Sequence, residues 1–170
     1  MKKYFVCLGA ILLLFIQCGC SNSDNELLSL TMETSINWRI SVVPPHSKLL
    51  YLNSNRGGFH GDGTEYFVLQ YKDEVDFAEM EIPNTYSDEN DTYVVTRGDA
   101  LNDEQFSQIQ SIIENLEDVP STYQIDKDHI DNYIEIRSTS KQRPDILSGD
   151  AFYIMQDAEI KCIYYLQKFL

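Results

Sequence analysis

Cysteine is scarce in most of this chain. The sequence contains four cysteines, three of them within the first twenty residues, and only Cys162 lies beyond that point. A single thiol cannot form an intramolecular disulfide, so an apolar core has to stabilise the folded part. Because Cys162 alternates with Ile160 and Tyr164, we interpret it as a small buried side chain rather than as a nucleophile.

Basic residues are also few. Lysine and arginine number 13 against 27 aspartates and glutamates, which gives a net charge of −14. Loss of residues 1–19 would remove two lysines and no acid, and would lower the net charge to −16. A chain this acidic is repelled by phosphate backbones, so we expect no nucleic-acid partner.

Long apolar runs are absent except near the start of the chain. Lys2 and Lys3 precede the mostly apolar residues 4–16, and no acidic residue occurs before Asp24. As a helix this segment would be about 20 Å long, shorter than the hydrocarbon core of about 30 Å. A basic start followed by a short apolar segment predicts a targeting signal rather than a stable transmembrane span.

The residues that follow the apolar segment carry a resemblance. Gln17-Cys18-Gly19-Cys20-Ser21 resembles the lipobox of bacterial lipoproteins, and this resemblance implies cleavage before Cys20, attachment of diacylglycerol to Cys20, and a position on the extracytoplasmic face of the cell membrane. We therefore expect a signal peptide over residues 1–19, a lipidated cysteine and flexible tether over 20–34, and one domain over 35–170. An ordinary signal peptide or an uncleaved anchor is the other interpretation.

Strand patterns dominate the expected domain. Apolar and polar residues alternate, or β-branched and aromatic residues cluster, in short segments bounded by turn residues. These segments are residues 36–42, 49–52, 65–71, 92–96, 130–137, and a C-terminal hairpin formed by 152–155 and 160–166.

One amphipathic helix interrupts the strands. Asn102 and Gln105 form a capping-box pattern, and Leu101 is placed as a hydrophobic staple. Apolar residues then recur at helical spacing from Phe106 to Leu116, and Pro120 prevents continuation. Together the patterns predict an α+β fold, with a mostly antiparallel sheet and this main helix packed on it in a single domain.

A glycine-rich segment lies between the second and third expected strands. It reads Arg56, Gly57, Gly58, Phe59, His60, Gly61, Asp62, Gly63, with four glycines in its last seven residues. It resembles a glycine-rich motif of small, uncharacterised bacterial lipoproteins, and the resemblance also covers the signal and the aromatic C-terminal strands. We treat these eight residues as a candidate binding segment, although we favour a structural hairpin loop as the explanation of the glycines.

Catalysis by this segment is the rival hypothesis. His60 and Asp62 are a possible acid and base pair for an envelope hydrolase, but no nucleophile accompanies them. A zinc site would need a third ligand, such as His46, and a phosphate loop would need a lysine and a helix where the sequence predicts a strand. We therefore expect no metal and no cofactor, and we favour a lipid-anchored binding or interaction module whose partner is an envelope protein or a small ligand.

Overall fold

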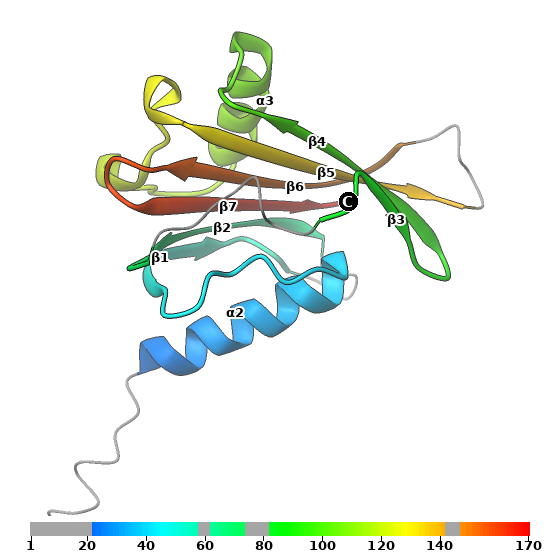
Figure 1. Cartoon of the computed structure of the whole chain (residues 1–170), viewed down its shortest axis with the longest axis horizontal. Helices are drawn as coiled ribbons and strands as arrows, with labels where there is room; N and C mark the ends of the chain where they lie inside the picture. The colour runs from blue at the N-terminus through cyan, green and yellow to red at the C-terminus, as the bar shows by residue number, and fades with distance from the viewer. Residues whose placement is uncertain (1–21, 58–61, 74–81, 142–146) are drawn as a thin grey trace, which may run out of the picture.

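The fold is built on one antiparallel sheet of seven strands, as a computed structural model shows (Figure 1). The structure describes residues 22–57, 62–73, 82–141 and 147–170. The strands lie in the order β1-β2-β7-β6-β5-β4-β3, and every neighbouring pair is antiparallel. Their bounds are β1 Lys48–Ser54, β2 Gly63–Gln70, β3 Thr85–Ser87, β4 Asp91–Gly98, β5 Asn132–Ser140, β6 Leu147–Asp157 and β7 Cys162–Phe169.

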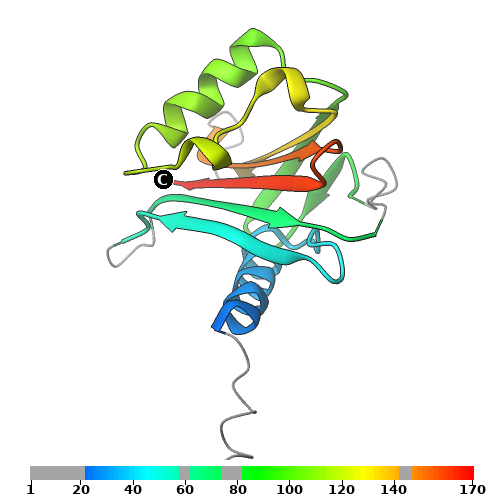
Figure 2. The same cartoon turned by 90° about the vertical axis from the view of Figure 1, so that its left-hand side faces the viewer.

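Two α-helices in the described part of the chain cover opposite faces of this sheet (Figure 2). Helix α2 (Asn22–Trp38) contributes to a core with Phe152 and Ile154, whereas helix α3 (Asp103–Ile113) contributes to a second core with Tyr153 and Met155. Alternate residues of a strand face opposite sides of a sheet, so β6 serves both cores. The α+β class, the antiparallel sheet and the single domain are confirmed, but one main helix is not.

The central strands are buried on both faces. In β2 the six residues from Thr64 to Leu69 are all buried, and in β7 the same holds for the six residues from Cys162 to Gln167. This explains why aromatic and β-branched residues stand next to one another there instead of alternating with polar ones. The expected strands 49–52, 65–71, 92–96 and 130–137 and the C-terminal hairpin are present, whereas the three-residue β3 was not foreseen.

Helix α3 begins where the capping pattern predicts. The side chain of Asn102 accepts a hydrogen bond from the Gln105 amide at 2.9 Å, and the Gln105 side chain accepts one from the Asn102 amide at 3.0 Å. Leu101, Ile109 and Ile113 are buried against the sheet. After α3 the chain forms two short 3-10 turns, Ser121–Tyr123 and Lys127–His129, before it enters β5.

The N-terminal boundary of the domain was predicted wrongly. We expected a tether up to residue 34 and a strand over 36–42, but residues 22–38 form α2, and residues 39–47 connect it to β1. Leu30, Thr34 and Trp38 lie on one side of the helix and are buried against the sheet. Burial of this side supplies the free energy that a polar tether would lack, so the folded unit begins well before residue 35.

Cys162 is buried, as expected. It is 5% exposed, and its thiol donates a weak hydrogen bond to the carbonyl oxygen of Ile160 at 3.7 Å. Burial, and secondarily the charge of Asp157, raise the pKa of this thiol above its usual value. Separately, none of the described helices is long and apolar enough to cross a membrane.

Candidate functional site

The glycine-rich segment connects β1 to β2, and backbone hydrogen bonds close the base of this hairpin. The amide of Asn55 donates to the Thr64 carbonyl at 3.0 Å, and the amide of Gly57 donates to the Asp62 carbonyl at 3.2 Å. The Asn55 side chain accepts a further bond from the Thr64 amide at 2.7 Å. Gly58, Phe59, His60 and Gly61 lie outside the described residues, so the structure places only the two ends of the candidate segment.

Gly63 occupies a position that other residues cannot take without strain. Its φ is +134°, and a Cβ atom built on it would lie 2.8 Å from the Cα of Arg56. By contrast, a Cβ on Gly57 would meet nothing closer than a carbonyl oxygen at 3.8 Å. The close approach of the two chains at the base of the hairpin therefore explains the glycine at 63 but not the glycine at 57.

Arg56 leaves the hairpin toward α2 and the C-terminal strand. Its guanidinium group forms an ion pair with Glu33 of α2 and lies 4.1 Å from the ring centroid of Phe169. The Arg56 side chain is 19% exposed. A cation held both by a carboxylate and by an aromatic face is fixed in direction, so Arg56 joins the hairpin to α2.

The buried side-chain amide of Gln167 connects β7 with α2 and β2. Gln167 of β7 is fully buried; its side-chain oxygen accepts a bond from the Trp38 indole at 2.7 Å, and its amide donates to Glu65 at 2.9 Å and to Thr34 at 3.4 Å. We call Glu33, Thr34, Trp38, Arg56, Glu65 and Gln167 the α2 polar cluster. It satisfies polar groups that would otherwise be costly to bury between the helix and the sheet.

Glu65 is the titratable group with unusual properties in this cluster. Its side chain lies between β2 and α2, and the residue is only 6% exposed. Burial, reinforced by the nearby charge of Glu33 and opposed by Arg56, raises the pKa of the Glu65 carboxyl from 4.5 to about 7. A carboxyl that titrates near neutrality can exchange protons with a ligand or sense pH, which makes it a candidate functional group.

The sequence identified part of this arrangement. Arg56 and Gly63 belong to the predicted segment and are brought together with α2, while Gly57 and Asp62 are exposed at the hairpin base. Glu65, Glu33 and Gln167 were not predicted. Two of these residues could have been noticed in the sequence, because Glu65 and Gln167 are an acid and an amide within the mostly apolar strands β2 and β7.

The structure gives no support to a zinc site with His46. That residue is exposed and has a positive φ of 59° in the connection between α2 and β1. Within residues 22–57, 62–73, 82–141 and 147–170, no three histidine, cysteine, aspartate or glutamate side chains are grouped so that they could hold a metal ion.

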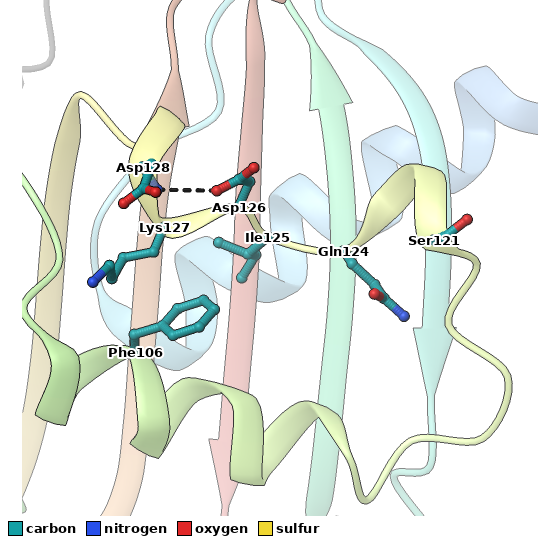
Figure 3. Close-up of a pocket in the computed structure, with 7 residues that line it drawn as sticks. All are labelled: Phe106, Ser121, Gln124, Ile125, Asp126, Lys127 and Asp128. Carbon is teal, nitrogen blue, oxygen red and sulfur yellow. Dashed lines mark hydrogen bonds between the residues drawn. The ribbon is translucent and has the colours of Figure 1, made fainter.

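A second candidate is an open pocket on the opposite side of the sheet, between α3 and the two 3-10 turns (Figure 3). It has a volume of about 450 Å³ and is lined by Phe106, Ser121, Gln124, Ile125, Asp126, Lys127 and Asp128. The Asp128 amide donates to the Asp126 side chain at 3.1 Å, and Lys127 forms an ion pair with Asp103 at 2.5 Å. The side chains of Asp126 and Lys127 are thus engaged locally, and no histidine lines the pocket.

Comparison with known proteins adds no assignment for either region. No protein-family model, no curated protein and no solved structure matches this chain. The resemblance to small bacterial lipoproteins therefore stays a prediction from the sequence.

We predict that Gly63→Ala destabilises the domain while Gly57→Ala does not. A Cβ at residue 63 meets backbone at 2.8 Å and a positive φ, so we expect a loss of about 1 kcal/mol or more in the free energy of unfolding. Gly57→Ala is the matched control and should be neutral or slightly stabilising, because alanine restricts the unfolded chain. Urea melts of both variants measure this, and equal losses would contradict the assigned hairpin geometry.

We also predict that Glu65 makes stability fall as the pH rises from about 4.5 to about 7. Over this interval the unfolded chain releases the proton while the folded protein retains it, because the pKa of Glu65 is about 7 in the fold and 4.5 outside it. Glu65→Gln keeps an acceptor for Gln167 and removes the titration, so its stability relative to the parent should increase across this range.

Urea melts at several pH values between about 4.5 and about 8 test this effect. Glu117→Gln removes an acid from an exposed position and is the control for net charge. A Glu65→Gln variant that follows the pH dependence of the parent would refute the shifted pKa.

Proposed function

We propose that the protein is a lipid-anchored binding or interaction module on the extracytoplasmic face of a bacterial cell membrane, with the lipid attached to Cys20. The observation that carries the proposal is the order of features along the chain. A basic start and an apolar segment precede Gly19 and Cys20, and the folded unit begins with α2 at Asn22. Lipid attachment at Cys20, followed by cleavage before it, would remove the apolar segment and leave the folded unit intact.

The geometry of the hairpin supports a binding role more than a catalytic one. Arg56 and Glu65 are engaged with α2 and β7, so their contacts hold the hairpin in place. Gly57 and Asp62 are exposed at its base. A loop carried by a rigid base is a common place for recognition, here of an envelope protein or a small ligand.

One observation favours the alternative, an envelope hydrolase that uses His60 and Asp62. The carboxyl group of Glu65, whose pKa is about 7, lies in the strand that follows these residues. General acid and base catalysis works best with groups that titrate near the working pH. Its burial argues against direct contact with a substrate, because a catalytic acid has to reach the reacting atoms.

We predict that Cys20→Ser abolishes lipid attachment. Only a thiol can form the thioether that joins diacylglycerol to the chain, and two acyl chains are needed for stable membrane anchoring. Metabolic labelling with a radioactive fatty acid, followed by membrane fractionation, measures both effects. Cys18→Ser is the matched control and should keep its label; unchanged labelling of Cys20→Ser would refute the proposed anchor.

We predict that His60→Ala distinguishes a structural loop from a functional site at His60. In a binding module without a catalytic histidine the variant should remain within about 0.5 kcal/mol of the parent in stability and should complement a deletion of the gene. The control is Gly63→Ala, which should lose stability. Loss of complementation by a fully folded His60→Ala protein would overturn the structural interpretation of the loop and assign His60 to a functional site.

A further inference from the structure

Helix α2 has an apolar side that the sheet does not cover. Its inner side carries Leu30, Thr34 and Trp38, which are buried. On the outer side, Leu28, Met32 and Ile36 are 59%, 57% and 58% exposed. At 3.6 residues per turn the two sides are separated by about 160°, so these three residues form a stripe that faces away from the sheet. We call Leu28, Met32 and Ile36 the outer stripe.

The outer stripe stands out from the rest of the described surface. Only six large apolar residues are exposed in the described part of the chain, and three of them lie on this one helix at intervals of four residues. The others, Val94, Ile160 and Leu170, belong to separate elements or loops. An apolar stripe on a short surface helix marks a contact with another apolar phase rather than with water.

The outer stripe also lacks charge, although the chain is strongly acidic. Its exposed neighbours on the helix surface include Asn25 and Ser29. Of the three acids of α2, Glu26 and Glu33 lie about 100° or more from the centre of the stripe at 100° per residue, whereas the exposed Asp24 lies one turn before Leu28, at the start of the helix. Between Leu28 and Ile36 the centre of this face carries no acid, so this part of it avoids repulsion by phosphate headgroups and suits insertion between lipids.

The closeness of the outer stripe to Cys20 in the chain indicates that the apolar phase it contacts is a lipid bilayer. Two residue steps of 3.8 Å separate Cys20 from Asn22, so the first residue of α2 would lie within about 7.6 Å of a lipidated cysteine. In both views α2 forms the outer boundary of the described molecule on its side of the sheet (Figures 1 and 2). This step rests on the proposed lipidation of Cys20.

We propose that α2 lies along the membrane surface and that Leu28, Met32 and Ile36 insert into the headgroup region of the bilayer that holds the anchor. The helix spans about 25 Å, so the stripe extends the contact well beyond the lipidated cysteine. The sheet then lies over α2, and α3 with the open pocket faces away from the membrane. Lipid thus covers the outer stripe, and the α2 polar cluster holds the sheet against the other side of the helix.

Thiol accessibility in vesicles tests this arrangement. The full chain with Met32→Cys is produced in a lipoprotein-processing host with a fatty-acid label, purified, and placed in phosphatidylcholine vesicles at low protein density. The rate of maleimide reaction at residue 32 is compared with that of Val94→Cys, an exposed residue of β4 on the α3 side of the sheet. We expect reaction at residue 32 to be about tenfold slower or more, because a thiol among lipids ionises poorly. Cys162 is buried and serves as the unreactive internal reference.

The outcomes separate the two proposals. Absence of the fatty-acid label overturns the lipid anchor, and the membrane contact with it. A labelled protein whose residue 32 reacts as fast as residue 94 overturns the membrane contact alone. Protection that disappears when the protein is diluted further in lipid would assign the outer stripe to a second copy of the chain, and would also overturn the proposal.

Discussion

The attachment of α2 to the sheet depends on one buried amide. Gln167 is fully buried near the end of β7, where an unsatisfied amide would cost far more than a missing apolar contact. Its partners come from α2 and β2, so Trp38, Thr34 and Glu65 must all be in place together. These hydrogen bonds fix the position of the helix, while the ion pair with Glu33 directs Arg56 and burial raises the pKa of the Glu65 carboxyl.

The α2 polar cluster also holds one side of the base of the glycine-rich hairpin. Arg56 is held from below by Glu33 and Phe169, while Asn53 and Asn55 donate to the carbonyls of Glu117 and Asn115 near the end of α3. The base of the hairpin is therefore fixed to both helical layers of the domain.

Local patterns predicted the strands and α3, because the information for them lies within a few residues. Asn102 and Gln105 cap α3 from neighbouring positions, and apolar side chains mark the strands. Helix α2 could not be predicted this way. Its apolar residues lie on two sides, and Ile36 and Trp38 imitate the alternation of a strand, whereas the contact that fixes the helix joins Trp38 to a residue 129 positions away. The polar cluster was missed for the same reason, since Glu65 and Gln167 meet only after β2 and β7 have paired.

The order of the strands has a consequence for how the chain folds as it is made. The last strand, β7, lies between β2 and β6, so the β1–β2 hairpin cannot join the rest of the sheet until the final residues are available. Until then α2 lacks Gln167 and most of the surface that covers Trp38. Such late closure keeps contact order high and folding slow. If the chain is exported as we propose, this delay would keep the emerging polypeptide unfolded until its passage through the export channel is complete.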